Sequence, residues 1–216
     1  CSDYSVLPSG QGFRRRYLGG SDDPVVMYLG RLSHKKGLDI LIRAFAIARR
    51  DGPACRLAIV GPDDEGLTVE LTALARREGV AEHVVLTGML NGVEKLDALA
   101  AASVWTLPSH TENFGNAVVE ALAAGRATVI SAAVNIAPEI AASDAGIVAA
   151  LSGEAFGAEI AALLRDDARR EALGARARAF ARCYDWSIVG PRLAEMYAQV
   201  AGRALPDAGS EVRICA

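Results

Sequence analysis

The amino-acid sequence predicts an α/β fold, a Rossmann-like, doubly wound parallel sheet of six strands with C-terminal helices. From Pro24 onward, short apolar and β-branched runs alternate with longer segments of helical period. The short runs are apolar almost throughout, which is typical of strands in a parallel sheet covered by helices on both faces. Six such runs are present, whereas a closed barrel of this kind needs eight strands.

Each element is predicted from its own residue pattern. Short apolar runs, most of them ended by a glycine, proline or serine, predict strands, and apolar residues three and four positions apart, such as Leu38, Leu41, Ile42 and Phe45, predict helices. In chain order we expect a strand at Val25–Gly30, a helix at Gly37–Arg50, a strand at Arg56–Gly61, a helix at Leu67–Glu78, a strand at His83–Gly88, a helix at Gly92–Ala102, a strand at Val104–Pro108, a helix at Asn116–Gly125, strands at Ala127–Ser131 and Ala145–Ala149, and helices at Glu154–Arg165, Ala168–Ala181 and Val189–Gly202.

The two ends of the chain lie outside this pattern. Residues 1–24 are polar and Gly-rich without a clear period, so we expect the remnant of an interdomain linker, with Arg14, Arg15 and Arg16 in solvent. Residues 203–216 also lack a pattern, which predicts a disordered tail. The domain itself is expected at residues 25–202, and because the chain begins at Cys1 we expect it to be cut from a longer protein.

Composition excludes several classes of protein. The formal net charge of -3 and the absence of a basic stretch interleaved with aromatic residues argue against a nucleic-acid partner. No apolar run reaches the 18 or more residues of a membrane span. The four cysteines are scattered, with no pair at ligand spacing, so no metal site is expected, and free thiols in a reducing cytosol are.

A doubly wound sheet binds its ligand where the strand order reverses, between strands 1 and 4 of the order 3-2-1-4-5-6. The loop after the first strand, "GRLSHKKG", carries Arg31, Lys35 and Lys36 just before a helix. Cations at a helix N-terminus oppose the helix dipole unless an anion is present, so this loop predicts a phosphate site. The alternative is a surface loop of three solvated basic residues.

This loop matches neither G-x-G-x-x-G nor G-x-x-x-x-G-K-[ST], which disfavours a dinucleotide dehydrogenase and a P-loop NTPase. The loop after the second strand, "GPDDEG", offers two further acids. Either Asp63 or Asp64 is expected to cap the following helix, and the alternative is an acid on a cofactor ribose.

The loop after the fourth strand, "PSHTENFG", leads into an apolar helix that keeps a single acid. Because Gly115 has no side chain, the amides of Phe114, Gly115 and Asn116 are open to an anion. Glu120 is expected to face a cleft, where the vicinal hydroxyls of a ribose would donate to its carboxylate. The alternative is a structural Glu120 paired with an arginine, while Glu112 is either a ligand contact or an acid favoured by the helix dipole.

These residues resemble the retaining, family-four glycosyltransferases of the GT-B architecture (glycosyl transferase group 1). The matching segments are "GRLSHKKG", "RLAIVG", "VVLTG", "TLPSHTENFGNAVVEALAAG" and "VNIAPEIAASDAGIV", and Glu112 with Glu120 fits the E-x7-E motif of that family. The segment "VLPSG" resembles an interdomain segment that often reads P-N-G, with Ser9 in place of the asparagine. The resemblance implies that this chain is the C-terminal, donor-binding half of such an enzyme.

The resemblance also implies roles for individual residues. Arg31 and Lys36 would hold the diphosphate, Glu112 the sugar hydroxyls and Glu120 the ribose. The remaining donor-binding positions would be backbone at Gly30, Gly88, Met89, Leu90, Phe114, Gly115 and Asn116.

The helix at Val189–Gly202 would cross back toward the missing N-terminal half. That half would bind a sugar or lipid-linked acceptor and make any peripheral contact with the inner face of the membrane. No D-x-D pair stands where it would hold a metal on the diphosphate, so we expect metal-independent transfer with no cofactor.

Two other functions stay open from the sequence. One is a GT-B nucleotide-sugar epimerase or phosphorylase, and the other is a nucleotide-binding module without catalytic activity. Having Glu112, Phe114, Gly115 and Glu120 in one loop and helix favours the transferase. A role in cell-envelope glycan synthesis is implied by the family resemblance alone. A 216-residue fragment is expected to bind nucleotide but to catalyse little transfer by itself.

Overall fold

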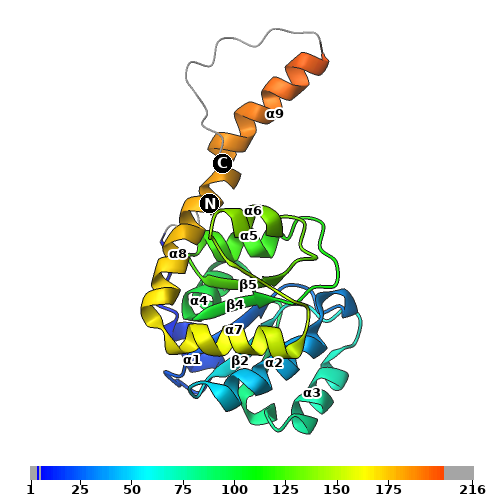
Figure 1. Ribbon diagram of the computed structural model, residues 1–216, viewed down its shortest axis with the longest axis vertical. Helices are drawn as coiled ribbons and strands as arrows, with labels where there is room; N and C mark the ends of the chain where they lie inside the picture. The colour runs from blue at the N-terminus through cyan, green and yellow to red at the C-terminus, as the bar shows by residue number, and fades with distance from the viewer. Residues whose placement is uncertain (1–3, 5, 202–216) are drawn as a thin grey trace.

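A computed structural model describes residue 4 and residues 6–201 of the chain. Six parallel strands form one sheet in the order β3-β2-β1-β4-β5-β6, which confirms the predicted fold class and strand order. Figure 1 shows this sheet with helices packed around it. The strands are β1 (Val25–Leu29), β2 (Arg56–Val60), β3 (Val84–Gly88), β4 (Val104–Leu107), β5 (Ala127–Ser131) and β6 (Ile147–Ala149).

The order reverses at β1, which pairs with both β2 and β4. Because crossovers between parallel strands are right-handed, the helices after β1 and β2 cover one face and those leading to β4 and β5 cover the other. The α-helices are α1 (Gln11–Tyr17), α2 (Leu38–Asp51), α3 (Thr68–Arg77), α4 (Gly92–Ala101), α5 (Asn116–Ala123), α6 (Ala137–Ala142), α7 (Gly153–Arg165), α8 (Asp167–Ala181) and α9 (Trp186–Val200). Between residues 6 and 201, short 3-10 helices lie at η2 (His34–Lys36), η3 (Ala81–His83) and η4 (Arg182–Tyr184).

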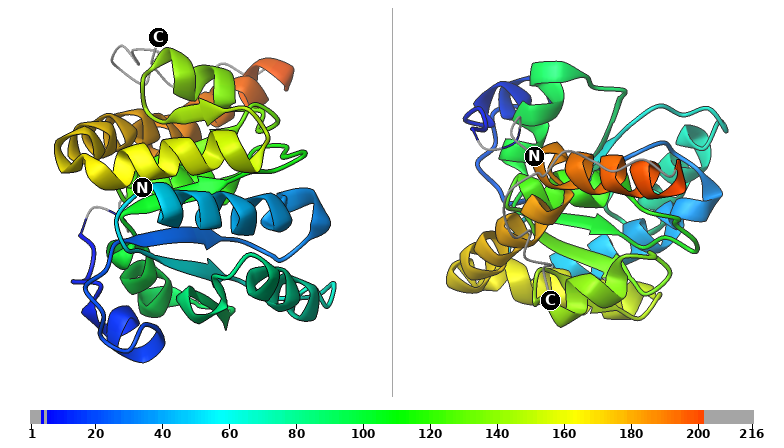
Figure 2. Two further views of the ribbon diagram at one scale, coloured as in Figure 1. Left: turned by 60° about the horizontal axis from the view of Figure 1, so that its bottom comes forward. Right: turned by 90° about the horizontal axis from the view of Figure 1, so that it is seen from above.

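The core lies between the sheet and the helices on its two faces. Helices α2 and α7 cover one face, and the helices leading to β4 and β5 cover the other. After β6 the chain returns to the first face, where α7 lies along α2 (Figure 2). Tyr28, Phe45, Trp105 and Phe156 are the largest side chains that are fully buried. The predicted apolar face of α2 is buried throughout, because its residues recur at the period that keeps one side of the helix on the sheet.

The lead-in to β1 is more structured than the sequence predicts. Residues 11–17 form α1, which packs against α4 and buries Phe13. Asp97 of α4 accepts hydrogen bonds from the amides of Gly10 and Phe13, and Arg14 donates to the carbonyls of Ser21, Asp23 and Ala101. The expectation that Arg14 is a solvated linker residue is therefore wrong. A helix of seven residues is too short to show a clear period in the sequence.

The last described helix, α9, differs from the rest because none of its residues is buried. It leaves the body of the domain after α8 and projects away from it in Figure 1. Asp185 caps it by accepting from the amide of Ser187, which explains why the helix begins three residues before the predicted start at Val189.

Residues 203–216, predicted to form a disordered tail, lie outside the described residues. Of the helices that the structure describes, none is long and apolar enough to cross a membrane.

A buried thiol makes stability depend on pH. Cys55 is fully buried, and burial raises its pKa to about 11 from the ordinary 9.0. Above pH 9 the thiol therefore ionises in the unfolded chain but stays neutral in the fold, so its stabilisation is lost as the pH rises from 9 toward 11. We expect urea unfolding to show a loss of about 1.4 kcal/mol between pH 8 and pH 10 that is absent from Cys55→Ala. Equal losses in both proteins would contradict this.

Candidate functional site

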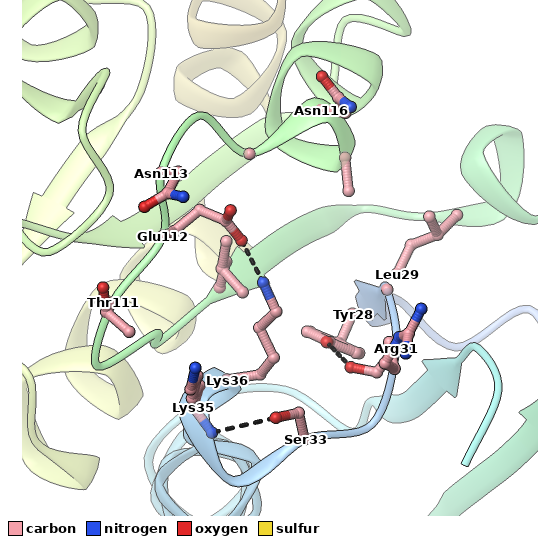
Figure 3. Close-up of a pocket in the computed structure, with 14 residues that line it drawn as sticks. Tyr28, Leu29, Arg31, Ser33, Lys35, Lys36, Thr111, Glu112, Asn113 and Asn116 are labelled. Atoms are coloured by element: carbon pink, nitrogen blue, oxygen red, sulfur yellow. Dashed lines mark hydrogen bonds and ion pairs between the residues drawn. The ribbon is translucent and has the colours of Figure 1, made fainter. Parts of the chain in front are cut away.

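A cavity of about 440 Å³ opens at the switch point, over the carboxyl ends of β1 and β4. The loop after β1 forms one wall, and the loop after β4 with the start of α5 forms the other (Figure 3). It is lined by Tyr28, Leu29, Gly30, Arg31, Ser33, Lys35, Lys36, Leu107, Thr111, Glu112, Asn113, Gly115, Asn116 and Ala117. The two loops singled out in the sequence thus meet in one place.

An ion pair joins the two walls. Lys36, at the end of η2, points across the cavity to Glu112, and its Nζ donates to Oε2 of that carboxylate (Figure 3). Both side chains are largely shielded, with 22% and 17% of their surface exposed. The pair therefore places a cation and an acid side by side at the cavity wall, where either could contact a bound ligand.

The backbones of the two loops are also bound together. The carbonyl of Lys35 accepts from the amide of His110 at 2.8 Å and from Oγ of the buried Ser109 at 2.9 Å. Ser131 at the end of β5 donates to the carbonyl of Ser109 at 2.6 Å. These bonds fix the separation of the walls. His110 acts here through its backbone, and its side chain does not line this cavity.

Arg31 lies on the opposite side of the cavity from Glu112 (Figure 3). Its side chain is 64% exposed and pairs with Asp64 at 3.0 Å, while its carbonyl accepts from the Tyr28 hydroxyl at 2.7 Å. Burial, followed by the charge of Glu112, raises the pKa of Tyr28, so this hydroxyl remains a proton donor. The guanidinium is exposed to solvent and free to turn toward an anion, because a surface pair of this kind contributes little.

The acids after β2 divide their roles. Asp63 accepts from the amides of Leu67 at 2.7 Å and Thr68 at 2.8 Å, as the capping hypothesis predicts. The hydroxyl of Thr68 also donates to Asp63, and this bond is the largest cause of the lowered pKa of Asp63. The bonds from the backbone amides lower that pKa further. Glu65 accepts from the amide of His34 and so supports η2 from below.

The start of α5 depends on glycine. Gly115 has φ +81°, and a Cβ there would lie 2.9 Å from Cγ2 of Val118. Only glycine fits both requirements without strain. The amide of Val118 donates to the carbonyl of Gly115 at 2.8 Å. The amides of Asn116 and Ala117, at the start of the helix, precede the first carbonyl that could accept within it, and both residues line the cavity.

Glu120 faces a second cavity of about 670 Å³ on the other side of the α5 N-terminus. Asn116 lines both cavities, so they adjoin. The partner of Glu120 is not the arginine considered in the sequence analysis but Lys95 of α4, whose Nζ lies 2.9 Å from Oε1. The side chain of Phe114 also lies in this second cavity, edge-on to Tyr184 at 5.4 Å between ring centroids.

The profile of one protein family, glycosyl transferases group 1, matches residues 12–180. This chain belongs to that family. The membership predicted from the sequence is therefore confirmed. Within the matched range lie the Arg31 and Lys36 loop, the E-x7-E helix and every strand of the sheet.

One curated protein and two solved structures show what this chain is similar to. A D-inositol 3-phosphate glycosyltransferase of Segniliparus rotundus is 32% identical over 203 residues, which cover 92% of this chain and 45% of that protein. Anabaena HepE, solved with UDP and glucose, superposes with a TM-score of 0.81 at 23% identity, covering 92% of this chain and 54% of that one. WaaG, a glycosyltransferase involved in lipopolysaccharide biosynthesis, gives a TM-score of 0.73 at 25% identity, covering 88% of this chain and 51% of that one. The chain thus spans about half the length of these relatives.

Not every predicted site residue of this family member lies at the two cavities. Gly30, Arg31, Lys36, Glu112, Gly115 and Asn116 line the first, and Phe114, Asn116 and Glu120 line the second. Gly88, Met89 and Leu90 line neither cavity, and their predicted contact with a base remains a prediction. Met89 is 62% exposed, whereas Leu90 is buried.

Two structural contributions were missed in the sequence. Tyr28 lies within the predicted buried strand, where nothing in the sequence indicates that its hydroxyl supports the backbone of Arg31. Lys95 lies on a surface helix where a lysine carries no signal by itself. Lys95 could have been found only by asking which cation neutralises the carboxylate of Glu120.

Proposed function

We propose that this chain is the donor-binding part of a retaining glycosyltransferase that moves a sugar from a nucleoside-diphosphate sugar to an acceptor. The observation that carries the proposal is the placement of the two family acids in adjoining cavities on either side of the α5 N-terminus. A molecule that spans this helix start would present its phosphates to α5, one end to Glu112 and the other to Glu120.

The first cavity suits the diphosphate and the sugar. Lys36 and Arg31 bring positive charge from the loop after β1, and the first turn of α5 brings amides and the positive end of its dipole. Glu112 can only accept hydrogen bonds when ionised, so it takes sugar hydroxyls and not phosphate oxygens. The ion pair with Lys36 keeps this acid beside the diphosphate without net repulsion.

Cleavage of the donor leaves negative charge on the departing diphosphate. Lys36 and the first-turn amides of α5 line the cavity before any ligand binds, so they would stabilise that charge without reorganising. Arg31 would add its charge by turning from Asp64 toward the bound donor. The proposal assigns this role to groups of the protein and uses no metal or other cofactor. Retention is proposed from membership of the family.

The second cavity suits the nucleoside. Glu120 offers a carboxylate to two ribose hydroxyls, each bond contributing about 1.5–3 kcal/mol. UDP is the first nucleotide to test, because HepE was solved with it. The acceptor would be bound by the part of the relatives that this chain does not span. A cell-envelope glycan acceptor is proposed because WaaG is involved in lipopolysaccharide biosynthesis. The proposed place of the sugar transfer is the cytoplasm, at the inner face of the membrane.

The proposal is tested by calorimetric titration of the chain with UDP, GDP and ADP. We expect one of the three to bind selectively, and we expect Glu120→Gln to weaken it about tenfold, because the neutral amide replaces one acceptor with a donor. Glu159→Gln on α7, whose side chain forms an exposed pair with Arg169 of α8, is the matched control and should leave the affinity unchanged. Absence of binding by the wild type, or equal affinity of Glu120→Gln, would contradict the proposed site.

A further inference from the structure

Behind the carboxylate of Glu120 lies a cation that the proposed reaction does not use. Lys95 projects from α4 and donates to Oε1 of Glu120 at 2.9 Å, and both side chains are 26% exposed. Glu120 lines the second cavity, whereas Lys95 does not. The lysine therefore reaches the carboxylate from outside the space that a ligand would fill.

The aromatic ring of Tyr4 lies beside Lys95 and Glu120. Tyr4 lines the second cavity, and the Lys95 ammonium lies 5.7 Å from the centre of its ring. Tyr4, Lys95 and Glu120 are also joined by side-chain hydrogen bonds. Burial alone would lower the pKa of Lys95, but the bonds to Glu120 and Tyr4 raise it, so the lysine stays charged around neutral pH. Burial raises the pKa of Tyr4, which keeps its hydroxyl protonated.

A carboxylate on a helix can turn about three side-chain bonds, and each loses freedom when a ligand is bound. Lys95 removes part of that freedom in advance by donating to Oε1 of Glu120. An ionised carboxylate has about four lone-pair sites, so the group can still accept from donors in the cavity. Groups held in place before binding gain affinity because the cost of ordering them is already met.

We propose that Lys95 is a positioning residue of the nucleoside site, holding Glu120 in the orientation that accepts from the ribose hydroxyls. This inference rests on the proposed function. It differs from a purely structural salt bridge, since an ion pair that merely joined α4 to α5 would affect all ligands alike. It also differs from an inhibitory contact, in which the lysine would compete with the ribose hydroxyls for Glu120.

The 2′-hydroxyl distinguishes these roles. UDP, GDP and ADP are titrated into the chain, each beside its 2′-deoxy form, and the nucleotide that binds is followed in the variants. We expect the wild type to prefer the ribose form about tenfold. Lys95→Met should bind the ribose form about tenfold more weakly and lose most of the preference, while Lys95→Arg should recover at least part of it. Glu94→Gln, the neighbouring exposed residue on α4, should change neither value.

The outcomes separate the inference from the proposed function. No nucleotide binding by the wild type overturns both. If the wild type binds and prefers ribose but Lys95→Met keeps the same preference, the positioning role is wrong and the donor site stands. Tighter binding by Lys95→Met would show that Lys95 competes with the ribose for Glu120, and this result would also overturn the inference. Thermal unfolding checks that each variant is folded, and Lys95→Arg provides the test if Lys95→Met is not.

Discussion

Replacing Lys36 by methionine is expected to weaken nucleoside-diphosphate binding about 100-fold. The change removes one charge-assisted bond, which contributes about 1.5–3 kcal/mol, and each tenfold loss of affinity corresponds to about 1.4 kcal/mol. It also leaves Glu112 without its partner, so that an acid on the cavity wall faces the incoming phosphates. Calorimetric titration with the nucleotide that binds the wild type measures the loss.

The control for this change is its neighbour. Lys35 is exposed and lines the same cavity, but no ion pair to Glu112 is found for it in the described residues. Lys35→Met should weaken binding by about threefold or less. Adding Glu112→Gln to Lys36→Met should recover part of the lost affinity, because the repulsion from the unpaired acid is then gone. Equal effects of Lys35→Met and Lys36→Met would show that the loop acts only as a diffuse positive surface.

Much of this architecture follows from local sequence. The alternation of apolar strands with helices of period 3.6 fixes the class of fold, and the switch-point rule then selects the two loops that line the first cavity. Arg31, Lys36 and Glu120 could be found because each stands out against a local expectation, either cations at the start of a helix or an acid in an apolar one. Glu112 lies in the loop before that helix and was singled out with Glu120 by the E-x7-E motif.

The partners of those residues could not be predicted, because they depend on tertiary contacts. Lys36 meets Glu112 only because backbone bonds between Lys35 and His110 set the height of one loop against the other. Glu120 was considered with an arginine, but the cation that reaches it comes from α4, 25 residues earlier in the chain. Sequence spacing contains no information on which surface helix lies beside α5.

The contact that holds the two loops together gives the largest expected loss of stability. Gly37 has φ +62°, and a Cβ on it would lie 2.0 Å from the carbonyl oxygen of Pro108. Gly37→Ala therefore combines a left-handed backbone that an alanine resists with a clash against the backbone at the end of β4. We expect urea unfolding to show a loss of about 2–5 kcal/mol.

Gly79→Ala separates the two causes. Gly79 has φ +72°, but a Cβ there would meet nothing within 4 Å, so the variant carries the backbone strain without the clash. Its expected cost is about 1 kcal/mol. The excess for Gly37→Ala is the energy of moving the loop after β4, and with it Glu112, away from Lys36. If that loop does move, the nucleotide affinity of folded Gly37→Ala falls while that of Gly79→Ala stays at the wild-type value. Equal stability losses in the two variants would mean that the loops yield easily, and a rigid, preformed diphosphate site would then be wrong.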